Sequence, residues 1–180
     1  MTSLQRRHAK AVNFGIVYGI SEFSLSEDIG VLVSEAKAYM DAYFERFSGV
    51  HRYMKSVVEQ AREQGYVETL MHRRRMLPEL SSSNFQVRSS GERMARNTPI
   101  QGTAADIIKL AMIRVDKALR RDYPEAKLIL QVHDELIVEC PEELAPQVAE
   151  LVSREMEHVA ELNVPLTAEA KWGKSWYDAK

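Results

Sequence analysis

The sequence contains one cysteine, Cys140, among its 180 residues. A disulfide framework needs cysteine pairs and a cysteine-rich zinc site needs several, so neither can organise this chain. Long apolar runs are also missing: no segment approaches the length of a membrane span, and the first residues lack the apolar stretch of a signal peptide. These absences predict a soluble, cytoplasmic protein without a membrane partner.

The chain also lacks a strong net charge. Its formal charge is -2 and its pI is near 6.2, while its 45% hydrophobic and 28% charged residues are typical of a globular protein. Any contact with a polyanion must therefore come from local clusters of cations. Three such clusters occur: Arg6 to His8 with Lys10, His72 to Arg75, and the set Arg88, Arg93 and Arg96.

The first cluster belongs to a regular pattern in residues 6–19. Four side chains stand four residues apart: Arg6, Lys10, Phe14 and Tyr18. A helix places them on one ridge, with cations at one end and aromatic rings at the other. Cations suit phosphate oxygens and aromatic faces suit a sugar or base, so a nucleoside triphosphate fits this ridge. The alternative is an ordinary amphipathic helix with its aromatic residues in the core and its cations solvated.

Helical patterns fill most of residues 1–70. We expect helices that end near Gly19, Gly30 and Gly65, with a further break at Gly49. A capping box at Ser24 to Glu27 and Ser34 predict two helix starts. Apolar residues at helical spacing predict a buried stripe: Ala36, Tyr39, Met40, Tyr43, Phe44 and Phe47.

An extended segment from Tyr66 to Leu70 leads into the basic run His72 to Arg75. The basic run is either a solvated turn or a clamp for phosphate groups. The residue pattern leaves both interpretations open.

A second series with a spacing of four follows at Arg93, Asn97 and Gln101, with Pro99 inside it. The proline predicts a kink or a break between two helices. One cation and two amides on one face suit a nucleic-acid backbone or the acceptors of the minor groove. The alternative is a helix cap with polar residues beside a bend.

Residues 127–140 change to the pattern of β-strands. Two aliphatic segments, Leu128 to Val132 and Leu136 to Val138, flank His133, Asp134 and Glu135. Adjacent carboxylates at the tip of a hairpin suit a hard divalent cation such as Mg²⁺, whereas a polar turn without a metal is the alternative. Pro141 then begins a helix, and the alternation in residues 164–172 predicts a half-buried strand.

Three motifs together resemble those of family A DNA polymerases, the bacterial DNA polymerase I group. Residues 6–19 resemble the family's finger-helix motif, in which Arg-x-x-x-Lys precedes Asn-Phe-Gly and Tyr-Gly. Residues 92–106 resemble its intervening helix motif, and residues 131–135 resemble its carboxylate hairpin. The resemblance covers essentially the whole chain. It implies an α+β fold, with a helical fingers portion at 1–70 and a partial palm at 71–180 that contains the antiparallel hairpin and flanking helices.

The resemblance implies template-directed DNA synthesis, as in replication and repair. In this reaction a primer 3′-hydroxyl attacks the α-phosphate of a deoxynucleoside triphosphate with the help of two Mg²⁺ ions. Arg6 and Lys10 would then bind the triphosphate, Phe14 would pack on the sugar and base, and Tyr18 would border the new base pair.

The resemblance also implies where primer-template DNA and metal are held. The implied DNA contacts are Arg93, Asn97, Gln101, Arg73, Arg74 and Arg75. His133 would approach the primer end, and Asp134 would ligate Mg²⁺ with Glu135 close by. The implied catalytic set is therefore Lys10, His133, Asp134 and Glu135.

The sequence departs from the family pattern in one large respect. The family's other metal-binding aspartate lies in a motif resembling Asp-Tyr-Ser, which this sequence lacks. We therefore expect a C-terminal part of a bacterial polymerase that needs the N-terminal part as its partner and is inactive alone. Smaller departures are His72, where glycine is expected, and Ser83, where arginine is frequent.

Two other functions remain open at this point. One is a non-catalytic nucleotide- or nucleic-acid-binding module that uses Arg6, Lys10 and Arg93. The other is a metal-dependent nuclease built on Asp134 and Glu135. That hypothesis assigns no function to the pattern in residues 6–19.

Overall fold

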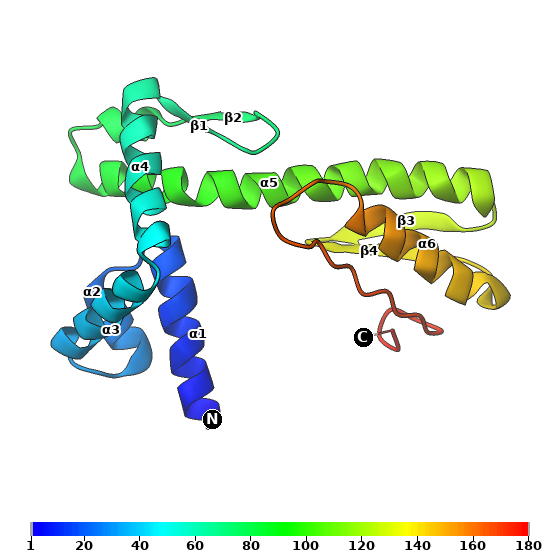
Figure 1. Ribbon diagram of the computed structural model, residues 1–180, viewed down its shortest axis with the longest axis horizontal. Coiled ribbons are helices and arrows are strands. Elements are labelled where there is room, and N and C mark those ends of the chain that lie inside the picture. The colour runs from blue at the N-terminus through cyan, green and yellow to red at the C-terminus, as the bar shows by residue number, and fades with distance from the viewer. Residues whose placement is uncertain (1, 180) are drawn as a thin grey trace. The chain divides into compact units, whose positions relative to one another are not determined.

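A computed structural model describes residues 2–179 and divides into two compact units (Figure 1). Unit 1 ends at Gly102 and unit 2 begins at Thr103, both within the long helix α5 (Phe85–Asp122). The α+β class is confirmed, because helices predominate and two small antiparallel hairpins accompany them. Residues 71–102 pack with the helices before them and so belong to unit 1. The boundary between fingers and palm at residue 70 stays a prediction.

Unit 1 begins with four helices: α1 (Ser3–Tyr18), α2 (Glu22–Ile29), α3 (Val33–Arg46) and α4 (Ser48–Gln64). The predicted helix ends at Gly19, Gly30 and Gly65 are confirmed, with φ angles of 79°, 68° and 79° in the left-handed region that glycine adopts readily. The start of α2 lies earlier than predicted, because Ser21 rather than Ser24 caps it.

Two predictions for α3 and α4 are wrong. Gly49 lies inside the first turn of α4, and the chain changes direction at Phe47 instead. Of the six residues in the predicted stripe only Ala36 is buried, while Tyr39 and Phe47 are about half exposed. The aromatic rings of this region pack on one another at the surface: the Tyr43 and Phe47 centroids lie 4.9 Å apart. The spacing of the apolar residues therefore predicted the helix correctly but did not predict which of its side chains are buried.

A short hairpin of β1 (Tyr66–Glu68) and β2 (Arg74–Met76) follows α4. After the 3₁₀ turn η1 (Pro78–Ser81) the chain enters α5. One core joins these elements: Val57, Val58, Ala61, Val67, Leu77, Leu80 and Ala95. The turn of the hairpin lies directly on α5 at Gly102, where an added Cβ would be 2.6 Å from Thr69 Cγ2.

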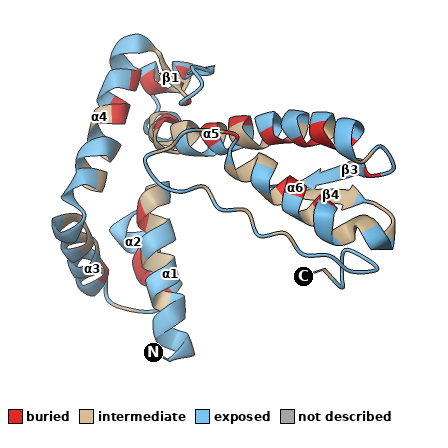
Figure 2. Cartoon of the chain, turned by 45° about the vertical axis from the view of Figure 1, so that its right-hand side comes forward, coloured by how far each residue is buried: buried red, intermediate tan, exposed pale blue. Residues whose placement is uncertain are grey.

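Helix α5 continues through Pro99, so of the predicted kink or break the break does not occur. A proline inside a helix removes one hydrogen bond and costs about 3 kcal/mol. Packing on both sides of the proline offsets that cost, since Ala95 is buried before it and Ala111 and Val115 are buried after it. Buried segments recur along α5 (Figure 2).

Unit 2 contains the C-terminal half of α5, β3 (Lys127–Val132), β4 (Glu135–Glu139), η2 (Glu142–Leu144) and α6 (Ala145–Glu157). The predicted hairpin is confirmed, with a register shift between Leu128 and Leu130. Its core comes mainly from α5 and α6: Val115, Ala118, Leu119, Ala126, Val148, Leu151 and Val152. Among residues 2–179 no helix has the length and apolar character needed to cross a membrane.

The predicted strand at 164–172 is wrong, because the described residues after α6 form no strand. Polar side chains of α6 hold this extended segment instead. Ser153 donates a hydrogen bond to the carbonyl of Ala168, and the Ala168 N–H donates to Glu157 at 3.1 Å. Hydrogen bonds with α6 side chains thus hold this segment, which pairs with no strand in the part of the chain that the structure describes.

We expect Gly102→Ala to destabilise the protein by about 1–3 kcal/mol, because the new methyl group overlaps Thr69 and separates the hairpin from α5. Gly49→Ala is the matched control, since that helical glycine has only the Arg52 guanidinium at 4.0 Å, and the change should stabilise by no more than about 1 kcal/mol. Urea unfolding of both variants measures the difference. Equal free energies of unfolding would show that the hairpin does not dock at Gly102.

Candidate nucleotide and nucleic-acid interface

The side chains of Arg6, Lys10, Phe14 and Tyr18, hereafter the ridge, lie on the exposed face of α1. Phe14 is 52% exposed and Tyr18 is 44% exposed. Their rings stack with centroids 6.4 Å apart and an interplanar angle of 16°, and the Lys10 ammonium lies 5.8 Å from the Phe14 centroid. The ridge is therefore a continuous surface that changes from cationic to aromatic.

The opposite face of α1 forms the core of this region. Ile16 is 1% exposed, and Ala11 and Val12 pack against Leu25, Ile29 and Ala36 of α2 and α3. This packing overturns the interpretation in which Phe14 and Tyr18 are core residues, because the core positions of α1 are already filled by other side chains. The ridge residues have no partner in that core, which leaves them free to contact a ligand.

The C-terminal end of α1 is fixed by its cap. The Gly19 N–H donates to the Ile16 carbonyl at 2.9 Å and the Ile20 N–H donates to the Gly15 carbonyl at 2.8 Å, the hydrogen-bond pair of a Schellman motif. The Ile20 side chain lies over Gly15, where an added Cβ would be 3.0 Å from Ile20 Cγ2. Tyr18, the last residue of the helix, is held in place by this turn.

A cavity of about 410 Å³ lies at the aromatic end of the ridge. Its lining combines both predicted contact regions of unit 1: Gly15, Tyr18, Gly19, Ile20, Ser21, Ser24, Ser89 and Arg93. The structure therefore brings Arg93, a predicted DNA contact, next to Tyr18, a predicted nucleotide contact. The serines were missed from the sequence, since Ser24 was assigned there to a capping box and nothing signals Ser21 or Ser89. Ser89 accepts a hydrogen bond from Arg93 at 3.2 Å.

Arg93, Asn97 and Gln101 lie on α5 and are exposed or partly exposed, so all three remain accessible. The basic run lies close to this row. Arg75 of β2 donates to Thr98 of α5 at 3.3 Å, so its guanidinium extends over the helix. Arg75 therefore lies on the Met94 and Thr98 side of α5, beside the face that carries Arg93, Asn97 and Gln101.

Arg74 is partly neutralised by its cross-strand partner. Its Nε lies 2.7 Å from a Glu68 carboxylate oxygen and its guanidinium lies 4.5 Å from the Tyr66 centroid. The hydrogen bond from Arg74 holds the pKa of Glu68 below its ordinary value. Arg73, Arg74 and Arg75 are all exposed, which leaves both a solvated turn and a phosphate contact open.

His72 has a φ of 59°, in the left-handed region that side chains other than glycine adopt at a cost. The polymerase resemblance leads us to expect glycine at this position. The backbone conformation gives the physical reason for that expectation, and histidine occupies it here with some strain.

The predicted metal-binding residues lie in unit 2, at the turn between β3 and β4. His133 has a φ of 53°, and a positive φ at the first of two turn residues is usually taken by glycine. The Gln131 side chain donates to the His133 carbonyl and supports the turn. Glu135 is the first residue of β4 rather than a loop residue, and both Asp134 and Glu135 are exposed.

The carboxylates do not form a closed metal site. Within the part of the chain that the structure describes, no group of three or more His, Cys, Asp or Glu is arranged to hold a metal ion. The donor chemistry nevertheless fits Mg²⁺, which is often bound by one or two protein carboxylates together with phosphate oxygens and water. Asp134 is suited to be one ligand of such a shared site.

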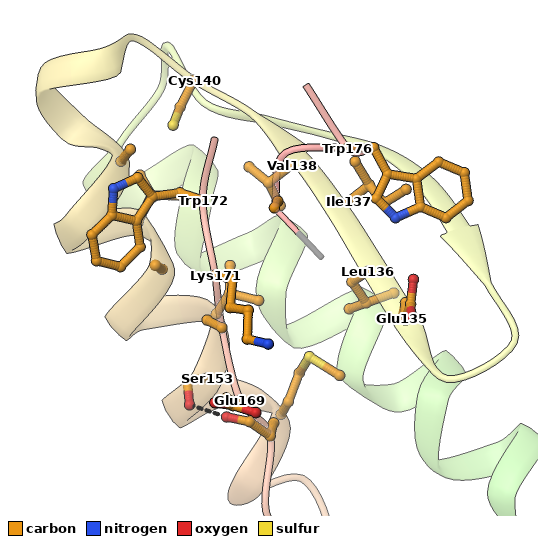
Figure 3. A pocket seen from close by; sticks show the side chains of 18 of the residues that line it. Glu135, Leu136, Ile137, Val138, Cys140, Ser153, Glu169, Lys171, Trp172 and Trp176 are labelled. Carbon is orange, nitrogen blue, oxygen red and sulfur yellow. Dashed lines mark hydrogen bonds between the residues drawn. The ribbon is translucent and has the colours of Figure 1, made fainter. Parts of the chain in front are cut away.

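A second cavity, of about 1500 Å³, lies within unit 2 between β4, α5, α6 and the C-terminal segment (Figure 3). Asp134 and Glu135 contribute to its lining, together with Leu136, Val138 and Trp172. It exceeds the range of about 300–1,000 Å³ that is usual for small-ligand pockets. Its size and its mixed lining of aliphatic and charged side chains indicate a broad surface rather than a pocket for one small molecule.

Comparisons with known proteins match nearly the full length of the chain to one protein family. The family model described as DNA polymerase family A matches residues 1–178. The chain is 55% identical to DNA polymerase I of Bacillus subtilis and 53% identical to DNA polymerase I of Streptococcus pneumoniae, in each case over 180 residues. These matches cover 100% of this chain and 20% of each relative, so the chain spans about a fifth of their length.

A solved structure is similar over the same extent. It is the POL domain of Pol1 from M. smegmatis in complex with DNA primer-template and dNTP. The TM-score is 0.94 and the sequence identity is 46%, covering 99% of this chain and 31% of that one.

We expect Ile16→Ala to lower the free energy of unfolding by about 2–5 kcal/mol, because it creates a cavity in the core beneath α1. Phe14→Ala removes a larger side chain from the same helix and should cost less than about 1 kcal/mol, because that ring is half exposed. Urea unfolding compares the two variants. A greater loss of unfolding free energy for Phe14→Ala than for Ile16→Ala would show that Phe14 is a core residue.

Proposed function

Because this chain belongs to DNA polymerase family A, we propose that it supplies the nucleotide-binding helix, part of the DNA-binding surface and a metal-binding carboxylate of a DNA-directed DNA polymerase. The observation that carries this proposal is the exposed ridge of α1, in which the order of chemical groups matches that of a nucleoside triphosphate.

The ridge is proposed to bind the incoming deoxynucleoside triphosphate. Arg6 and Lys10 are exposed and contact the phosphate groups, where charge-assisted hydrogen bonds are strongest. Phe14 packs on the sugar and base, and Tyr18 borders the new base pair. The near-parallel arrangement and the exposure of the two rings support these roles, since both rings stay accessible to a ligand.

The second surface is proposed to hold primer-template DNA. Arg93, Asn97 and Gln101 contact the duplex near the primer terminus, and the basic run adds phosphate contacts through Arg73 to Arg75. Support comes from the cavity that joins Tyr18 to Arg93 and from the position of Arg75 over α5. The M. smegmatis relative was solved with DNA primer-template and dNTP, which is consistent with both surfaces.

Asp134 is proposed to ligate Mg²⁺, with Glu135 and His133 beside it at the turn. When bound, the metal would activate the primer hydroxyl and stabilise the negative charge of the phosphates. The strained turn at His133 supports a functional role, because such conformations concentrate at active sites.

Most of the work of the chain's own residues is positioning and charge stabilisation. Arg6 and Lys10 neutralise charge on the triphosphate, and Phe14 with Tyr18 orient the base so that the α-phosphate faces the primer end. Phosphoryl transfer of this kind needs no protein nucleophile. The proposed setting is bacterial DNA replication and repair in the cytoplasm, where DNA and nucleotides are both present.

One observation favours a more limited function for the chain alone. The residues that the structure describes include no three-ligand metal group, and the sequence lacks the family's other aspartate motif. We therefore propose that the isolated chain binds nucleotide and DNA as a non-catalytic module, and that chemistry needs the rest of the polymerase.

We expect the 180-residue chain to bind deoxyadenosine triphosphate in the presence of Mg²⁺ without extending a primer. Lys10→Gln should weaken that binding by about tenfold or more, because it removes a charge-assisted contact to phosphate worth about 1.5–3 kcal/mol. Isothermal titration measures the binding, and a labelled primer-template with all four nucleotides measures extension.

Lys55→Gln on α4 provides the matched control, since it removes the same charge from an exposed lysine outside the ridge and should leave the affinity unchanged. Equal losses in both variants would mean that only the total charge matters. Primer extension above background by the unmodified chain would refute its inactivity.

A further inference from the structure

The C-terminal end of α1 has an unusual source of positive charge. Cations near the C-terminus of a helix interact favourably with its dipole, yet α1 has no basic residue in its last turn. Arg96 of α5 lies there instead: an added Cβ on Gly19 would be 3.1 Å from Arg96 Nη1 and 3.8 Å from Arg96 Cδ. The absence of a side chain at Gly19 is what allows this close approach.

The guanidinium of Arg96 is held in position by Glu92. Arg96 Nη2 lies 3.4 Å from one oxygen of Glu92, and Arg62 of α4 lies 2.5 Å from the other. The side chains of Arg96 and Glu92 are only 23% and 25% exposed, so solvent screens this pair less than the surface pairs of the chain. A continuous series of charges therefore links α4, α5 and the end of α1.

The contact lies beside the cavity that separates the end of α1 from α5. Gly19 and Tyr18 line that cavity on one side, and Arg93 lines it on the other. Arg93 Cγ also lies 3.6 Å from the position of a Cβ on Gly19. These arginine contacts add to the Gly19 and Ile20 cap in holding the end of α1.

We propose that Arg96 is a positioning residue for nucleotide selection. Fixed by Glu92, it holds the last turn of α1 and thereby sets the orientation of the Tyr18 ring and of the Phe14 ring stacked on it. This inference rests on the proposed function of the ridge. Arg96 affects binding of the base and sugar of a deoxynucleoside triphosphate rather than of its phosphates, because Arg6 and Lys10 lie at the opposite end of the helix.

The first test needs no nucleotide. Arg96→Met keeps a long unbranched side chain and removes the charge. Amide hydrogen exchange at Ile16 to Ile20 should therefore be about two- to fivefold faster than in the unmodified chain. Arg120→Met is the matched control: that arginine also lies on α5 and pairs with a carboxylate four residues away, Asp116 at 3.0 Å. The control should leave exchange at the end of α1 unchanged.

The second test separates positioning from general stability. Arg96→Met should weaken binding of deoxyadenosine triphosphate about two- to fivefold and leave binding of inorganic tripolyphosphate unchanged. Arg96→Lys, which retains the charge, should restore most of the nucleotide affinity. Glu92→Gln should reproduce part of the loss, because it releases Arg96.

Two results overturn the inference, and a third separates it from the proposed nucleotide site. Unchanged exchange in Arg96→Met, or an equal loss of affinity for deoxyadenosine triphosphate and tripolyphosphate, overturns the inference. If the unmodified chain binds no nucleotide while Arg96→Met still exchanges faster, the nucleotide site of the ridge is refuted and the Arg96 contact is supported.

Discussion

The packing of one face of α1 against α2 and α3 is the constraint on which the rest of the account depends. Ile16 and its neighbours fill the core, and the cap at Gly19 and Ile20 fixes the end of the helix. With those positions taken, Arg6, Lys10, Phe14 and Tyr18 must face outward. Exposed aromatic rings in line with exposed cations cost the protein hydrophobic burial, and the proposed nucleotide ligand would contact both the cations and the rings.

Helix α5 provides a second constraint through close backbone approaches. At Gly102 it contacts Thr69 of the β1–β2 turn, which brings the basic run toward the row of Arg93, Asn97 and Gln101. Its arginines also meet the end of α1 at Gly19. Residues that are far apart in the sequence thus gather at the aromatic end of the ridge, and the proposed nucleotide contact and the proposed nucleic-acid contact both lie in unit 1.

The sequence predicted the features that depend on local chemistry. Gly19, Gly30 and Gly65 end helices because their left-handed backbone favours glycine, and the two aliphatic segments that flank Asp134 form the expected hairpin. Burial could not be predicted in the same way, because the spacing of Tyr39 or Phe14 defines a face without saying what covers it. The strand at 164–172 failed because alternation does not supply a partner strand. The approach of Arg96 to Gly19, and the cavity that Arg93 and Tyr18 both line, depend on tertiary packing that no local pattern encodes.

The most direct test of the ridge as a nucleotide site is an NMR titration of the labelled chain with deoxyadenosine triphosphate and, separately, with inorganic tripolyphosphate. The account predicts that both ligands shift the signals of Arg6 and Lys10, and that only the nucleotide shifts the ring signals of Phe14 and Tyr18. Signals that move mainly on α3 and α4, or aromatic rings that respond equally to both ligands, would contradict it.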